Sequence, residues 1–317
     1  MFTLSLRTHR PVLSALAFAA MAASFQVVAA DNKSWCAERC DQIVIDWNLQ
    51  THQVIKAADG YADPMAASRI LAMVHLAMHD AANAAEPRYR TYAYTPGTGT
   101  GMPAADATVA AAVAAHDVLA ALYPKQKELV QSTLDSTQLD AGIGEAVEQG
   151  KRLGSATAAA MLARRSNDGS RSNEAYQPGT HPGAYRFVPG FEFIAAPHWR
   201  SVAPFTLRSP DQFRVAAPPA LGSEAYAVAF NEVKATGSKA ADAERSADQT
   251  QYAAYWYEFS DIGWNRIARV VARDKWQDLW QRARTFALLN AVMADAYSAG
   301  WDSKMHYCIS ASRSTRA

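Results

Sequence analysis

The sequence of 317 residues has few cysteines, almost no excess of either charge and little sign of β-structure. Alternation of apolar and polar residues, which a half-buried strand requires, is nearly absent. Lys and Arg number 31 against 30 Asp and Glu, which leaves a formal net charge of +1. This balance offers no basic stripe and no acidic tail, so we do not expect the protein to bind nucleic acid.

Common catalytic motifs are also missing. The sequence contains no Gly-x-Ser-x-Gly nucleophile elbow, no His-Glu-x-x-His zinc motif and no pair of Glu-x-x-His motifs. Cys36 and Cys40 are too few for a cysteine-ligated metal site, and their spacing does not fit haem attachment. They form either a local disulfide or two unreactive thiols.

The first 30 residues resemble an export signal. Arg7 and Arg10 precede an alanine-rich apolar run over 12–28, and small residues follow up to Ala30. This pattern predicts a signal peptide cleaved after Ala30, and therefore a periplasmic or secreted protein. The alternative is an uncleaved anchor, but serine and glutamine make the run weakly hydrophobic for a bilayer span. No later stretch is long and apolar enough for stable membrane insertion.

Elsewhere the apolar period is helical, which predicts an all-α fold. With 50% hydrophobic residues the chain can bury a large core. Asp63-Pro64 and Met102-Pro103 place proline in a first helical turn, and Gly300 follows a predicted helix end. The predicted helices are 41–58, 64–85, 103–123, 125–139, 144–165, 222–234, 240–259 and 274–299.

Residues 176–219 cannot be helical, because eight prolines alternate there with aromatic residues. The segment is too hydrophobic for a disordered linker, so we expect an ordered strap that crosses the helices. We therefore predict one helical domain over 31–307. The alternative is a division into two domains near residue 200.

The predicted helix 64–85 is apolar except for one polar stripe. The stripe consists of Ser68, Arg69, His75, His79, Asp80 and Asn83. His75 and His79 have the i, i+4 spacing of a metal chelate, which His116 and Asp117 could complete. The alternative, which we favour, is that these groups form hydrogen bonds with one another and with loop backbones, without a metal.

Two carboxylates share a face of the last predicted helix and its extension. Asp295 and Asp302 are seven residues apart, a spacing that suits acid–base catalysis but more often orients a neighbouring arginine. The charged residues between Asp274 and Arg284 fit a solvated helix face.

Short segments that occur in order along most of the chain carry a resemblance to a known family. They are 44–48, 72–83, 88–89, 115–118, 122–124, 264–265, 286–290, 293–295 and 301–304. In these segments the chain resembles the bacterial vanadium-dependent haloperoxidases, which are relatives of the type 2 phosphatidic acid phosphatases. The resemblance implies a helical bundle that holds vanadate or phosphate between its helices. It further implies either halide oxidation by hydrogen peroxide or phosphate ester hydrolysis, with a small-molecule substrate.

The family's anion site consists of a Lys followed after six residues by Arg-Pro, then Pro-Ser-Gly-His, and then Ser-Arg with a later His. Lys304 fits the first position, but Ala311 and Ser312 stand where Arg-Pro is expected. A tetrahedral oxyanion needs several converging donors, and a single flexible Lys cannot replace a bidentate Arg. We therefore expect Lys304 to bind vanadate or phosphate weakly, and the chain to be catalytically incomplete and inactive alone.

Residues 308–317 differ in character from the rest, being rich in Ser and Arg with no apolar period. We expect that a frameshift near codon 308 replaced the Arg-Pro segment and truncated the chain. The alternative is that the helical region is a genuine product, acting as a non-catalytic binding or oligomerisation scaffold. A homo-oligomer is therefore among the expected assemblies.

Overall fold

The computed structural model describes residues 28–96, 105–187, 190, 192–237 and 244–307, with side chains from residue 42 onward except 138–140. Within these residues the chain forms nine α-helices and no strand. The helices are α1 Val28–Ala57, α2 Pro64–Ala85, α3 Ala107–Leu122, α4 Lys127–Ala141, α5 Glu145–Arg164, α6 Glu224–Thr236, α7 Ala247–Tyr255, α8 Ser260–Asp274 and α9 Leu279–Tyr307. The predicted all-α class is confirmed.

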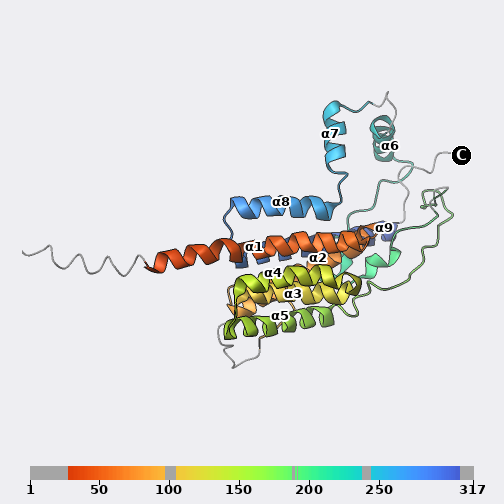
Figure 1. Ribbon diagram of the computed structural model, residues 1–317. Coiled ribbons are helices and arrows are strands. Elements are labelled where there is room, and N and C mark those ends of the chain that lie inside the picture. Colours follow the sequence, from red (N-terminus) through yellow and green to blue (C-terminus); the bar gives the residue numbers. More distant parts are fainter. Residues whose placement is uncertain (1–27, 97–104, 188–189, 191, 238–243, 308–317) are drawn as a thin grey trace, which may run out of the picture.

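Helix α2 is the centre of the bundle, where it packs against α3, α5 and α9. Asp63 caps its first turn by accepting a hydrogen bond from the Ala66 N–H, and Pro64 occupies the first helical position. Most of its side chains are buried, including residues of the polar stripe, because neighbouring helices cover nearly its whole circumference. Figure 1 shows α1 and α3–α5 running alongside each other in this bundle, while α6 and α7 stand away from it beyond α8.

Close contact between α3 and α5 depends on small residues. A Cβ atom added at Gly154 of α5 would lie 2.5 Å from the Ala110 carbonyl oxygen of α3. At Gly150 it would lie 2.7 Å from the Asp106 carbonyl oxygen. The two helix backbones can approach this closely because glycine has no side chain.

Several predicted helix boundaries are confirmed and others are wrong. Helix α2 has the predicted bounds, but α3 begins at Ala107 instead of residue 103, because Asp106 caps it by accepting from the Thr108 and Val109 N–H groups. The predicted helix 240–259 is shorter, and the prediction missed α8. The last helix begins later, at Leu279, and continues through Gly300 to Tyr307, so Gly300 does not end it.

The proline-rich segment 176–219 crosses the helices without α-helical structure in its described residues, as predicted. It includes two short 3₁₀ helices, η3 Pro197–Ser201 and η4 Pro210–Phe213, both of which contact α9. Trp199 and Phe205 are buried, which anchors this strap to the helical core.

Among the described residues, no helix combines the length and apolar character needed to cross a membrane. The predicted signal sequence lies outside the described residues as far as residue 27, and so does the predicted tail 308–317. The side chains of Cys36 and Cys40 are likewise outside the description, so the disulfide remains a prediction.

Candidate functional site

Lys304, the predicted anion ligand, lies near the C-terminal end of α9. Its ammonium sits 3.9 Å from the centroid of the Trp301 ring, one turn earlier on the same helix. Partial burial of the side chain lowers the pKa of Lys304 from its ordinary value, although the residue as a whole is exposed. Among the side chains that the structure describes, no carboxylate forms an ion pair with Lys304. Its positive charge is therefore not neutralised by a neighbour.

The strap holds the last turns of α9 through three contacts around Lys304. Arg214 donates two hydrogen bonds of 2.7 Å to the two carboxylate oxygens of Asp302. The Tyr307 hydroxyl donates to the Val215 carbonyl at 2.8 Å. The Trp301 indole donates to the Ala195 carbonyl at 2.9 Å. These contacts fix the helical turn that carries Lys304.

Asp295, two turns before Asp302, binds the strap in a different way. Its carboxylate accepts the backbone N–H groups of Phe205, Thr206 and Leu207 at 2.5, 2.7 and 3.1 Å. It also accepts the Thr206 hydroxyl at 2.5 Å. Both carboxylates thus position the strap, and the interpretation that such a pair orients a neighbouring arginine holds for Asp302. Neither carboxylate is free for acid–base catalysis.

The cations near the end of α9 do not form a complete oxyanion site. The Arg214 guanidinium is paired with Asp302. Lys304 has no carboxylate partner among the described residues at this end of α9. A tetrahedral oxyanion requires donors from several directions. Among the described residues, Lys304 can serve as the first ligand of such a site, but the further donors that the site needs are not supplied.

The polar stripe of α2 binds the loop that follows the helix. His79 Nε2 lies 3.0 Å from the Arg90 carbonyl oxygen. Asp80 accepts the backbone N–H groups of Tyr92, Ala93 and Tyr94 at 2.6, 2.7 and 2.9 Å. The interpretation that the stripe bonds to loop backbones is therefore confirmed for His79 and Asp80.

The residues of the alternative metal site do not come together. His75 bonds to Asn48, whereas His116 Nδ1 bonds to Asp117 at 2.7 Å and its Nε2 lies 3.1 Å from Gln131 Oε1. Within the described part of the chain, no three His, Cys, Asp or Glu side chains are grouped to hold a metal ion.

A buried hydrogen-bond network joins α1, α2, α8 and α9. Asn48 Nδ2 lies 2.9 Å from His75 Nε2 and donates to Asn265 Oδ1 at 2.8 Å. Asn265 donates to Asn290 Oδ1 at 2.8 Å, and Arg269 donates to Asn48 Oδ1 at 2.6 Å. All but Arg269 are fully buried. Sequence reasoning assigned these asparagines no role, although each lies in a segment that carries the family resemblance.

Burial strongly perturbs two titratable groups beside this network. Desolvation, assisted by nearby His52 and Arg269, lowers the pKa of His75 to about 3, so this imidazole is neutral. Desolvation raises the pKa of Asp261 to about 7, and neither carboxylate oxygen of Asp261 accepts a hydrogen bond in the structure. The Asp261 carboxylate is fully buried in the first turn of α8, and no counter-ion contacts it among the described side chains.

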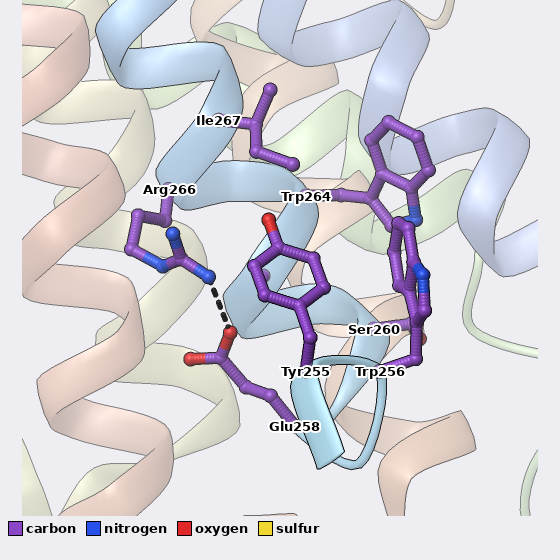
Figure 2. Close-up of a pocket in the computed structure, with 8 residues that line it drawn as sticks. Tyr255, Trp256, Glu258, Ser260, Trp264, Arg266 and Ile267 are labelled. Carbon is purple, nitrogen blue, oxygen red and sulfur yellow. Dashed lines mark hydrogen bonds and ion pairs between the residues drawn. The ribbon is translucent and has the colours of Figure 1, made fainter. Parts of the chain in front are cut away.

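A pocket lies where the end of α7 meets the first turns of α8. Figure 2 shows the rings of Tyr255, Trp256 and Trp264 around it, with Glu258 and Arg266 joined by an ion pair of 2.8 Å. The pocket does not include Lys304 or the strap. It is therefore separate from the predicted anion site.

The helical bundle and its strap belong to a recognised class of all-α proteins. Residues 39–193 match the family described as the vanadium chloroperoxidase N-terminal domain. Over these residues the chain carries the N-terminal helical portion of the vanadium haloperoxidase family. A comparison with curated protein sequences returns no match.

Solved structures share this fold. A bacterial vanadium-dependent iodoperoxidase is 22% identical with a TM-score of 0.71, and the match covers 85% of this chain and 70% of that protein. The holo form of a bacterial vanadium-dependent chloroperoxidase is 16% identical with a TM-score of 0.58, covering 78% of this chain and 63% of that protein. The apo form of a bacterial vanadium-dependent chloroperoxidase is also 16% identical, with a TM-score of 0.57, and the match covers 77% of this chain and 62% of that protein. The chain thus spans less than two thirds of the chloroperoxidase.

Proposed function

We propose that this chain provides the N-terminal helical framework of an exported vanadate- or phosphate-binding enzyme, with Lys304 as its first anion ligand. The complete enzyme would oxidise halide with hydrogen peroxide or hydrolyse a phosphate ester, in either case acting on a small molecule. The observation that carries this proposal is the placement of Lys304. Its ammonium has no carboxylate partner among the described residues, packs on Trp301 and is held in a turn that the strap fixes.

The chemistry available to these residues is anion binding without turnover. Vanadate, when bound in the complete family, supplies the centre that activates peroxide. In this chain Lys304 offers one flexible cation, and the strap keeps Arg214 engaged with Asp302. No described histidine stands beside Lys304 in a hydrogen-bonded arrangement that would make it a nucleophile. We therefore propose weak, salt-sensitive oxyanion binding and no catalysis by these 317 residues alone.

The test is a titration of the full chain with orthovanadate, followed by ⁵¹V NMR and repeated with inorganic phosphate. Replacing Lys304 by Gln should weaken binding about 10-fold or more, because a charge-assisted contact is lost. The control is Lys275→Gln, which removes a cation that precedes the first residue of α9, at the opposite end of that helix from Lys304. Equal binding by Lys304→Gln and the unchanged chain would disprove the role of Lys304.

Activity assays test the second part of the proposal. Bromide oxidation with hydrogen peroxide and vanadate, and hydrolysis of an aryl phosphate, should both remain at the level of the protein-free control. Turnover in either assay that disappears in Lys304→Gln would contradict the proposed incompleteness and would identify the reaction.

A non-catalytic helical scaffold is the second candidate function. It is favoured by one observation, the concentration of exposed aromatic side chains on α7 and α8.

A further inference from the structure

The carboxyl group of Asp261 lies between α8 and the bundle without a partner. Its side chain is fully buried in the first turn of α8. Neither of its oxygens has a hydrogen-bond partner, and the nearby Ser68 hydroxyl of α2 is also buried without one. No described Lys, Arg or His side chain forms an ion pair with Asp261. Because burying an ionised carboxylate without donors is strongly unfavourable, this position accepts a neutral carboxyl far better than a charged one.

The contact between α8 and the bundle contains little apolar surface. Helix α8 packs against α9, α1 and α2. Its buried residues are Asp261, Asn265, Ala268 and Ala272. Two of them are polar and two carry only a methyl group, so α8 inserts no fully buried large apolar side chain into the core. Since buried apolar area is the main stabilising contribution in most helix contacts, the attachment of α8 depends unusually strongly on its polar groups.

Little else holds the first turn of α8. Phe259, at the N-cap position, forms no side-chain hydrogen bond to the first turn, so its backbone N–H groups lack the usual acceptor. The two preceding helices, α6 and α7, contain no buried residue. Figure 1 shows them standing away from the bundle beyond α8. The segment before α8 therefore does not clamp its first turn against the bundle.

The other titratable groups near this contact do not neutralise Asp261. They are His52 of α1, Tyr61 of the α1–α2 connection, Asp63 at the start of α2, His75 of α2, Tyr297 of α9 and Arg269 of α8. Burial lowers the pKa of His52 to about 4 and that of His75 to about 3, so both imidazoles are neutral. Burial and the nearby Asp261 raise the pKa of Tyr61 and Tyr297, so both phenols are neutral. Arg269 and Asp63 form hydrogen bonds with other residues.

We propose that α8 is a pH-sensitive helix, whose first half, residues 260–267, is closed on the bundle while the Asp261 carboxyl is protonated and opens when that carboxyl ionises. The proton is released to solvent as the carboxylate becomes hydrated. The charge that is unfavourable in the closed state is then in water, where it needs no protein donor.

The open state loses identifiable contacts. Asn265 gives up its hydrogen bonds of 2.8 Å with Asn48 and Asn290. The Ser260 hydroxyl leaves the Tyr297 hydroxyl of α9, which lies 3.1 Å away in the closed state. These losses keep the open state a minor one in acid, and ionisation of Asp261 raises its population.

The direction of the pH dependence follows from the number of protons bound in each state. Burial raises the pKa of Asp261 from 3.8 to about 7 in the closed state, whereas the open state exposes this carboxyl to water. Between these two values the closed state holds one more proton than the open state. The ratio of open to closed molecules therefore increases with pH from about pH 4 and becomes constant above about pH 7.

The experiment measures amide hydrogen exchange of the full chain by mass spectrometry at about pH 5 and about pH 8, with each rate divided by the intrinsic rate at that pH. Protection of residues 260–267 should fall about 10-fold or more from the lower to the higher pH. At both pH values it should be at least about 10-fold lower than the protection of α2, because α8 opens without unfolding of the bundle.

Variants assign the pH dependence to Asp261. Asp261→Asn removes the titrating group and should reduce the change to less than about 3-fold. Asp274→Asn, which removes an exposed carboxylate from the other end of α8, should keep the full change. If Asp261→Asn does not fold, Asp261→Ala makes the same test. The proposal would be overturned by protection of 260–267 that equals that of α2, that is the same at both pH values, or whose pH dependence persists without the Asp261 carboxyl.

Discussion

The carboxylate of Asp295 on α9 accepts the backbone N–H of Phe205 in the strap at 2.5 Å, across 90 positions of the sequence. The same carboxylate accepts three further hydrogen bonds from Thr206 and Leu207. A segment without regular secondary structure has no ladder to satisfy its backbone donors. Asp295 accepts the backbone N–H groups of the strap instead, and these hydrogen bonds fix the strap to the helix that carries Lys304.

Replacing Asp295 by Ala should therefore destabilise the fold by about 3 kcal/mol, because buried N–H groups of the strap lose their acceptor. Urea unfolding followed by circular dichroism measures this change. The control is Glu86→Ala, which removes an exposed ion pair with Arg88 and should cost less than about 1 kcal/mol. Equal effects of the two substitutions would contradict the structural role of Asp295.

Asp261 gives the protein a pH-dependent stability of defined sign. Burial raises the pKa of this carboxyl from 3.8 to about 7 in the folded state, so the folded chain binds a proton more tightly than the unfolded chain. Its stabilising contribution is complete below pH 3.8 and is lost as the pH rises through about 7. Asp261→Asn removes this titration and should be more stable than the unchanged chain above neutrality.

The stability difference between Asp261→Asn and the unchanged chain should grow by roughly 3–4 kcal/mol from about pH 4 to about pH 8. Urea unfolding at several pH values provides the measurement. Comparing the two proteins isolates Asp261 from His75, whose pKa is lowered by burial and whose contribution runs in the opposite direction. A constant difference across this range would show that Asp261 does not titrate there.

Asn265 connects three helices through its amide, and its loss should be costly. Asn265→Ala leaves the Asn48 and Asn290 amides without their shared partner, so we expect a loss of about 2–3 kcal/mol. Thermal unfolding would register this as a lower midpoint. Asn231→Ala on the exposed side of α6 should leave the midpoint nearly unchanged.

Two identical glycine substitutions should have opposite effects. Gly154→Ala places a methyl group 2.5 Å from the Ala110 carbonyl oxygen and should destabilise the fold by about 1–3 kcal/mol. Gly300→Ala meets no atom within 4 Å and lies inside α9, where alanine should stabilise the helix by up to about 1 kcal/mol. Thermal unfolding compares them directly. Destabilisation by both would indicate that α9 does not continue through Gly300.

The sequence alone determined the helical class, because the apolar period is local and reads directly from neighbouring residues. It determined the start of α2, where Asp63 and Pro64 act on their own helix, and it predicted an ordered strap from its prolines and aromatic residues. It also predicted Lys304 as an anion ligand from its place in a motif, and that role stays a prediction. What Lys304 contacts did not follow from that place.

The tertiary structure decided what distant residues do to one another. It assigned Asp295 to the strap backbone and Asp302 to Arg214, where the sequence left acid–base catalysis open. It also brought Asn48, His75, Asn265 and Asn290 into one network. Sequence reasoning missed α8, whose buried face combines Asp261 and Asn265 with two alanines, while Trp264 is exposed. Such pairings depend on which helix faces pack together, and no local pattern encodes that choice.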